Sequence, residues 1–134
     1  MRTLEELRAL FEADRFAMEA GIGIDSAADG EAVCSLALGP GHLNAEGYPQ
    51  GGLMYTLADF AFAVAANHSR PVTVTLDGTI HYMKATRAKR LSAKAVPRSA
   101  GRTTCVYEVL ITDEAGNEVA LATFTGYTKR PKNK

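Results

Sequence analysis

The chain has 134 residues, which is enough for one domain with a core of ordinary size. Its 15 Lys and Arg residues balance 15 Asp and Glu residues, so no overall field favours nucleic acid or an anionic membrane. No apolar stretch reaches the roughly 18 residues that a membrane-spanning helix needs, and the acidic N-terminus lacks the apolar centre of a secretion signal. We therefore predict a single cytoplasmic domain over residues 1–134, with no nucleic-acid or membrane partner.

The cysteines and histidines do not have the spacing of a metal site. Cys34 and Cys105 lie far apart in strand-like segments, as expected for reduced thiols in a core. The 3 histidines are scattered along the chain without the intervals typical of metal ligands. We predict neither a metal nor a redox cofactor.

A short helical segment is predicted at residues 1–18. Thr3 and Glu6 have the spacing of a capping box, and they are followed by an apolar stripe at helical spacing, formed by Leu4, Leu7, Leu10 and Phe11. Glycines and polar residues then interrupt the pattern. Residues 31–38 are typical of a strand, and residues 39–52 contain many turn formers.

The central element is a helix predicted at residues 51–67. Apolar side chains cover nearly every direction around it at about 100° per residue, which is typical of a helix enclosed by protein. Four strand-like segments follow it, at residues 71–83, 91–97, 103–113 and 118–129, with a hairpin turn at 114–117. In the first of these, alternation predicts one face that carries Val72, Val74, Leu76, Ile80 and Tyr82.

This order of elements predicts an α+β fold. A short N-terminal helix, one or two strands, the central helix and an antiparallel meander of four strands give a curved sheet packed on one helix. Five or six strands on a single helix leave much of the sheet uncovered, so we expect the protein to associate with itself.

Asp59 is the only charged residue in the central helix. Burial of an unpaired carboxylate is costly, and it raises the pKa or requires hydrogen-bond partners. One interpretation is structural: Asp59 caps a neighbouring loop or pairs with a basic residue at the edge of the domain. The other interpretation is catalytic, and the start of the same helix favours it.

The helix starts with Gln50, Gly51 and Gly52, which leaves backbone N–H groups of its first turn open to a ligand. With the positive end of the helix dipole, such groups stabilise a developing oxyanion. Gly51 and Asp59 are about 12 Å apart along one helix, too far to act on the same carbonyl. If both serve one reaction centre, the acid belongs to a second, antiparallel helix, and the pattern then predicts a homodimer with two equivalent sites.

These residues resemble a known family. The pattern closely resembles the signature of hotdog-fold acyl-CoA thioesterases of the phenylacetate-degradation type, which belong to the 4-hydroxybenzoyl-CoA thioesterase-like superfamily. The residues that carry the resemblance are Asn44, Gly47, Gln50, Gly51, Gly52 and Asp59. The similarity extends over residues 20–128 and includes the strand at 72–85. It implies a hotdog fold, in which a curved antiparallel sheet of five or six strands wraps around one central helix.

The resemblance also implies roles for single residues. Asp59 would attack the thioester carbonyl or activate a water, and Gly51 of the partner subunit would donate its backbone N–H to the thioester oxygen. Asn44 would orient the water or the acyl carbonyl, and Thr75 would help to hold the nucleophilic water. A thioester has a good thiolate leaving group, so one carboxylate and an oxyanion site are chemically sufficient.

Gln50 departs from the family signature, in which a histidine precedes the two glycines. Glutamine donates a hydrogen bond to a thioester carbonyl but does not carry a proton, so Gln50 stays among the candidate catalytic residues. The difference supports an alternative function, a non-catalytic acyl-CoA-binding module. A hydroxyacyl thioester dehydratase is a weaker alternative, because that chemistry typically needs a histidine with an acid.

The candidates for substrate binding are residues near the helix start and in two connections between strands. They are Gly52, Tyr48, Lys84, Arg87, Arg90 and Arg102. The basic members suit the phosphates of coenzyme A, and the alternative is that they are solvated surface residues.

We predict an acyl-CoA thioesterase that releases a carboxylic acid and free coenzyme A. It would form a homodimer and, by pairing of dimers, a homotetramer, with coenzyme A as part of the substrate.

Overall fold

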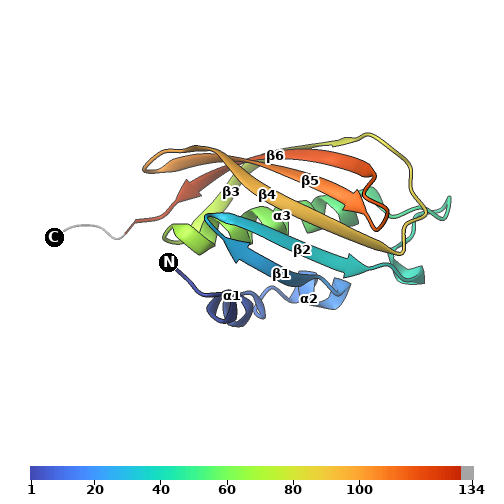
Figure 1. Cartoon of the computed structure of the whole chain (residues 1–134), viewed down its shortest axis with the longest axis horizontal. Helices are drawn as coiled ribbons and strands as arrows, with labels where there is room; N and C mark the ends of the chain where they lie inside the picture. The colour runs from blue at the N-terminus through green and yellow to red at the C-terminus, as the bar shows by residue number, and fades with distance from the viewer. Residues whose placement is uncertain (131–134) are drawn as a thin grey trace.

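The computed structural model describes residues 1–130 and has a 6-stranded antiparallel sheet that curves around one long helix (Figure 1). The strands are β1 (Gly23–Ala28), β2 (Glu31–Ala37), β3 (Thr73–Tyr82), β4 (Arg90–Ala100), β5 (Thr104–Asp113) and β6 (Glu118–Thr128). The helices are α1 (Leu4–Phe11), α2 (Arg15–Ala20) and α3 (Gly51–Ser69), with a 3₁₀ turn at Pro40–His42. The predicted hotdog fold is confirmed.

The N-terminal segment forms two helices, each with a side-chain cap. In α1 the Thr3 hydroxyl accepts from the Glu6 N–H at 3.1 Å, and the Glu6 carboxylate accepts from the Thr3 N–H at 2.9 Å, as the capping box predicts. In α2 the Asp14 carboxylate accepts from the Ala17 N–H at 3.1 Å. This helix ends at Gly21, whose φ of 87° is readily adopted only by glycine.

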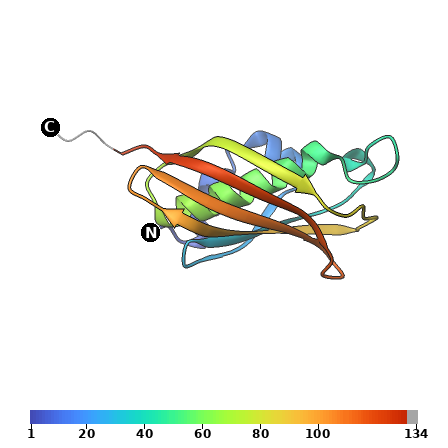
Figure 2. The same ribbon diagram turned by 90° about the horizontal axis from the view of Figure 1, so that it is seen from above.

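The strand order is β1-β2-β4-β5-β6-β3. The predicted meander of four strands is therefore wrong, because β3 pairs with β6 at the far edge and not with β4. The chain reaches that edge through α3, which crosses the inner face of the sheet, and returns to β4 through the long connection beside the start of α3 (Figures 1 and 2).

A bulge in β3 reverses the alternation of its side chains. The pairing with β6 shifts between Thr75 and Asp77, and such an extra residue moves later side chains to the opposite face. Val74, before the bulge, is 38% exposed, whereas Ile80, after the bulge, packs against the core. The predicted single apolar face of this strand is therefore wrong.

The core lies between α3 and the inner face of the sheet. Phe62 of α3 is fully buried, and its ring centroid lies 5.3 Å from that of Tyr107 and 5.4 Å from that of Phe124. A Cβ on Gly126 would lie 2.7 Å from the Phe62 ring, so glycine is what allows β6 to approach the helix this closely.

The protomer leaves one side of α3 uncovered. Gly52, Thr56, Asp59 and Ala63 are not buried, and their intervals of three and four residues place them on one stripe. The prediction of a helix enclosed on all sides is therefore wrong for a single protomer. Among residues 1–130, no helix is both long and apolar enough to cross a membrane.

Candidate active site

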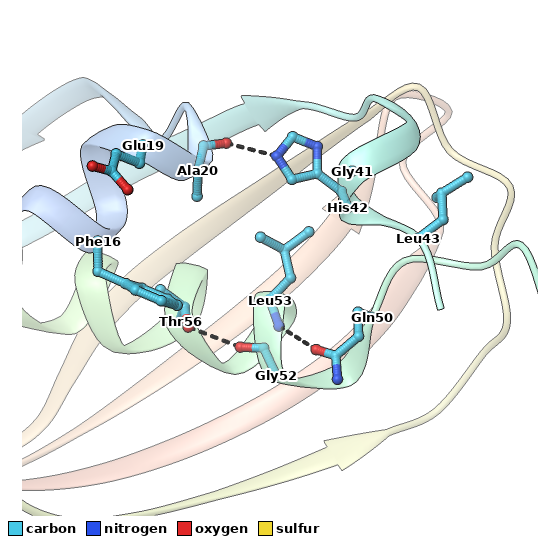
Figure 3. Close-up of a pocket in the computed structure, with 10 residues that line it drawn as sticks. All are labelled: Phe16, Glu19, Ala20, Gly41, His42, Leu43, Gln50, Gly52, Leu53 and Thr56. Carbon is cyan, nitrogen blue, oxygen red and sulfur yellow. Dashed lines mark hydrogen bonds between the residues drawn. The ribbon is translucent and has the colours of Figure 1, made fainter. Parts of the chain in front are cut away.

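The start of α3 presents free backbone donors. Gln50 is the N-cap residue, and its side-chain Oε1 accepts from the Leu53 N–H at 3.0 Å (Figure 3). Its own N–H donates to the His42 carbonyl at 2.9 Å. Within the described residues, no hydrogen bond engages the N–H groups of Gly51 and Gly52. These two donors lie at the positive end of a 19-residue helix and suit a carbonyl oxygen that gains negative charge.

Asn44 shapes the loop in front of these donors. Its Oδ1 accepts from the N–H groups of Glu46 at 2.9 Å and Tyr48 at 3.1 Å, and its N–H donates to the Tyr48 carbonyl at 2.7 Å. Gly47 closes the turn with a φ of 82°, which favours glycine. The Asn44 Nδ2 makes no hydrogen bond in the described part of the chain, so it remains free to donate.

Asp59 lies on the uncovered stripe of α3 and contacts β3. Its Oδ1 accepts from the Thr75 hydroxyl at 2.8 Å. Burial raises the pKa of the Asp59 carboxyl above its ordinary value, the Thr75 hydrogen bond lowers this pKa in part, and the Asp14 carboxylate raises it. The structure thus brings Thr75 to the acid, as the sequence resemblance implies.

The structural interpretation of Asp59 does not match its surroundings. No basic side chain forms an ion pair with it among residues 1–130, and its recorded hydrogen bond is the one from Thr75. Asp59 is also only partly buried in one protomer. An unpaired acid with one open oxygen is free to accept a proton.

A cleft of about 730 Å³ flanks the start of α3. It is lined by Phe16, Glu19, Ala20, Gly41, His42, Leu43, Gln50, Gly52, Leu53 and Thr56. Figure 3 shows the Phe16 ring directed from α2 toward Thr56 on α3. The sequence analysis missed Phe16 and Glu19, because they belong to a segment that predicts only a helix. The exposed aromatic side chain of Phe16 is visible only in the folded chain, where it is 73% exposed.

His42 is locked by two hydrogen bonds in this cleft. The Gly39 N–H donates to Nδ1 at 2.9 Å, and the ring Nε2 lies 2.8 Å from the Ala20 carbonyl. A carbonyl only accepts, so Nε2 is the donor in this contact and Nδ1 is the acceptor in the other. With both nitrogens in use, His42 joins the loop to α2 and is not a free base.

A second cleft, of about 330 Å³, lies on the other side of the helix start. Asn44, Tyr48, Gly51 and Lys84 line it together with Tyr82, which the sequence analysis did not select. The Arg87 guanidinium lies 4.5 Å from the centre of the Tyr48 ring, a cation–π distance.

The predicted basic residues do not form one cluster within a protomer. Lys84, Arg87 and Arg90 lie at the end of the molecule where α3 starts, and Arg102 lies at the other end, in the β4–β5 connection (Figure 1). Arg90 donates to the Ser35 hydroxyl at 2.6 Å, so part of its guanidinium is engaged by the fold. Lys84 donates to the Asn117 side chain at 3.2 Å.

The cysteines lie outside both clefts. Cys34 and Cys105 are free and buried, and burial raises the pKa of both thiols, which makes them poor nucleophiles. Within residues 1–130, no three His, Cys, Asp or Glu side chains are grouped as a metal site requires.

Comparison with known proteins identifies the family. Residues 47–120, more than half of the chain, match the family model of the thioesterase superfamily. The chain belongs to the thioesterase superfamily. The matched residues contain the start of α3, Asp59 and Thr75.

Two proteins from other organisms are similar to this chain in sequence. The chain is 33% identical over 127 residues to the acyl-coenzyme A thioesterase PaaI of Escherichia coli, covering 94% of this chain and 89% of that protein. It is also 33% identical over 100 residues to a putative esterase of Archaeoglobus fulgidus, covering 74% of this chain but only 65% of that protein.

Two solved structures are similar to this one over most of the chain. The Escherichia coli PaaI structure superimposes with a TM-score of 0.87 at 31% identity and covers 92% of this chain and 91% of that chain. A hypothetical thioesterase of Streptococcus pneumoniae, solved with coenzyme A, gives a TM-score of 0.82 at 31% identity and covers 92% of this chain and 99% of that chain.

Proposed function

We propose that this protein is an acyl-CoA thioesterase whose active site is shared between two subunits of a homodimer. One observation carries the proposal: the free N–H donors of Gly51 and Gly52 and the unpaired carboxylate of Asp59 belong to one partly uncovered helix, and Gly51 and Asp59 are about 12 Å apart along it. A second α3 packed antiparallel on the uncovered stripe would place the donors of each subunit near the acid of the other. The named activity of the Escherichia coli relative and the coenzyme A bound to the Streptococcus pneumoniae protein support this function.

The chemistry needs one proton acceptor and one oxyanion site. The thioester oxygen would accept the Gly51 N–H from one subunit, and Asp59 of the other would take a proton from a water that attacks the acyl carbon. The C–S bond then breaks, the carboxylic acid forms, and the Asp59 proton passes to the departing thiolate. The raised pKa makes Asp59 a stronger base than an ordinary aspartate. Direct attack by the carboxylate is the alternative route to the same products.

The other candidates would assist this reaction. Thr75 would fix the carboxylate, and Gly52 would provide a second backbone donor. Asn44 and Gln50 would use their side-chain N–H groups, since their amide oxygens are occupied by the loop and by the helix cap.

Coenzyme A would be held between the subunits. In an antiparallel pair of α3 helices, the end of one protomer that carries Tyr48, Lys84 and Arg87 lies beside the end of the other that carries Arg102. The two groups would then share one nucleotide, and Arg90 would add charge at the rim. We further propose that dimers pair into a tetramer and that the protein acts in the cytoplasm, where its free thiols stay reduced.

One observation favours a second candidate, a non-catalytic acyl-CoA-binding module. The residue before the two glycines is a glutamine, and its Oε1 caps α3. It therefore contributes no proton to a reaction. A binding module would be stabilised by acyl-CoA without hydrolysing it.

Thiol release from acetyl-, hexanoyl-, benzoyl- and phenylacetyl-CoA distinguishes the two candidates. We expect hydrolysis by the wild type and a fall of at least about a hundredfold in Asp59→Asn, as for a lost catalytic base. Asp77→Asn is the matched control. Asp77 is an exposed aspartate of β3 and has no role in the proposed reaction. Wild-type rates in Asp59→Asn would refute the catalytic role, and stabilisation without thiol release would support the binding module.

A further inference from the structure

We propose that Tyr82 is a positioning residue that holds the first turn of α3 and, with it, the second oxyanion donor, the Gly52 N–H. The Tyr82 hydroxyl donates to the Gly51 carbonyl at 2.7 Å. This inference rests on the proposed function, because it concerns the donors that would polarise the thioester.

The start of α3 needs support from outside the helix. Glycine is about 1 kcal/mol less favourable than alanine in a helix, and Gly51 and Gly52 occupy its first two positions. Helix ends also fray. When the helix end frays, its backbone N–H groups no longer point at the substrate. An oxyanion site built from these glycines therefore requires a contact that fixes the first turn.

The Tyr82 hydrogen bond supplies that contact. The Gly51 carbonyl and the Gly52 N–H belong to one planar peptide group, so a donor on the carbonyl also fixes the direction of the N–H. A hydrogen bond to the carbonyl further polarises the peptide and strengthens the N–H as a donor. Gln50 restrains the other side of the same turn through Leu53.

Tyr82 is itself held firmly. It is the last residue of β3 and pairs with the buried Ala120 of β6. Directly after it, the N–H groups of Met83 and Lys84 both donate to the Val119 carbonyl, at 2.8 and 3.1 Å. The sheet therefore fixes the position of the tyrosine, and the tyrosine transmits that position to the helix.

Glycine at position 51 is explained by the same contact. A Cβ at Gly51 would lie 3.1 Å from the Tyr82 hydroxyl oxygen and 3.2 Å from the ring carbon that bears it. These distances are tighter than ordinary van der Waals contacts, so Tyr82 occupies the space that a side chain at 51 would need. Burial raises the pKa of Tyr82, and the hydroxyl thus keeps the proton that it donates.

Tyr82→Phe removes the hydroxyl and keeps the ring, so the kinetic effect tests the hydrogen bond alone. With whichever of the four acyl-CoAs the wild type hydrolyses fastest, we expect kcat to fall about tenfold, as for one lost hydrogen bond, and KM to stay within about twofold. Tyr127→Phe is the control, because the Tyr127 hydroxyl makes no hydrogen bond among residues 1–130 and its residue is 42% exposed.

A spectroscopic signature separates positioning from a general loss of structure. In the Asp59→Asn background, the carbonyl stretch of the same acyl-CoA, labelled with ¹³C, should lie below that of the free thioester. Adding Tyr82→Phe should move it back toward the free value, whereas adding Tyr127→Phe should not. An unchanged frequency, or an unchanged kcat, overturns the role of Tyr82. A wild type that releases no coenzyme A overturns the proposed function instead, so the two failures are distinguishable.

Discussion

Two opposing effects set the basicity of Asp59. Burial raises the pKa of its carboxyl, and the hydrogen bond from Thr75 lowers it. The first effect makes the carboxylate a better proton acceptor, and the second favours its ionised form. The bulge in β3 comes directly after Thr75. The Thr75 hydroxyl therefore points toward α3, and only the residues after it change their register with β6.

Thr75→Val should shift the pH dependence of hydrolysis. The variant loses the hydrogen bond that favours the ionised carboxylate, so the pKa of Asp59 rises further. Because the proposed reaction needs ionised Asp59, the acid limb of the kcat/KM profile should move to higher pH. The profile is measured by thiol release over about three pH units below neutrality. Thr79→Val, an exposed threonine of the same strand, should leave the limb in place, and an unmoved limb in Thr75→Val would contradict this tuning.

Asp59→Asn should stabilise the fold at neutral pH. The folded-state pKa of Asp59 is raised, so the folded protein binds this proton more tightly than the unfolded chain does. Protonated Asp59 therefore stabilises the folded state below the pKa of the unfolded chain, about 3.9. This contribution to the free energy of unfolding is lost as pH rises through the raised pKa of the folded state. Urea unfolding should show the variant more stable than wild type at pH 7, with the difference shrinking in acid. A constant difference at all pH values would show that the charge is not its cause.

Residues of the site differ in how far the sequence reveals them. Asp59, Gly51 and Asn44 belong to one local pattern that the chain displays directly, and the structure brings Thr75 to the acid as expected. Phe16 and Tyr82 carry no such pattern. Their positions beside the start of α3 depend on how α2 and the end of β3 pack against that helix, which is a tertiary property.

At the level of elements, the start of α3 combines weak helix formers with specific restraints. Glutamine is not among the favoured N-cap residues, which are Ser, Thr, Asp and Asn. Its longer side chain nevertheless reaches the Leu53 N–H at 3.0 Å. This residue thus has a structural role in addition to its proposed contact with substrate.

Gln50→Ala should lower the free energy of unfolding by about 1 kcal/mol, the usual effect of a lost N-cap. Gln50→Asn is the matched variant, because asparagine is a good cap and should retain most of the stability. Urea unfolding of the two variants and the wild type measures the difference. Equal stability of Gln50→Ala and the wild type would show that the Oε1 hydrogen bond is energetically neutral.

The elements also show what local patterns leave open. Alternation and the turn at 114–117 locate β5 and β6, and the Asp113 carboxylate secures that turn by accepting from the N–H groups of Ala115 and Asn117. Alternation does not say which strand is the neighbour. The placement of β3 beside β6 follows from the crossing of α3, and the bulge follows from that pairing, so neither is predictable from the β3 sequence alone.

At the scale of the whole molecule, β3 is an unpaired edge that is rich in exposed apolar side chains. Val74 is 38% exposed and Leu76 is 59% exposed, and the outer edge of β3 has no neighbouring strand in the described chain. Proteins usually cover or charge such edges. The uncovered stripe of α3 lies next to this strand, because Asp59 contacts Thr75. Pairing of two β3 edges would thus cover both surfaces together and bring two α3 helices side by side.

Leu76→Lys tests this arrangement without changing a residue of the proposed site. A charge on the edge opposes strand pairing, so light scattering after size exclusion should show a monomer in place of a dimer. Thiol release should fall with it, since each site would need the Gly51 N–H of one subunit and the Asp59 of the other. Leu10→Lys makes the same change at a leucine of α1 that is 47% exposed and should alter neither measurement. A fully active monomer would contradict the shared site, and a dimer that persists in Leu76→Lys would place the interface on a different surface.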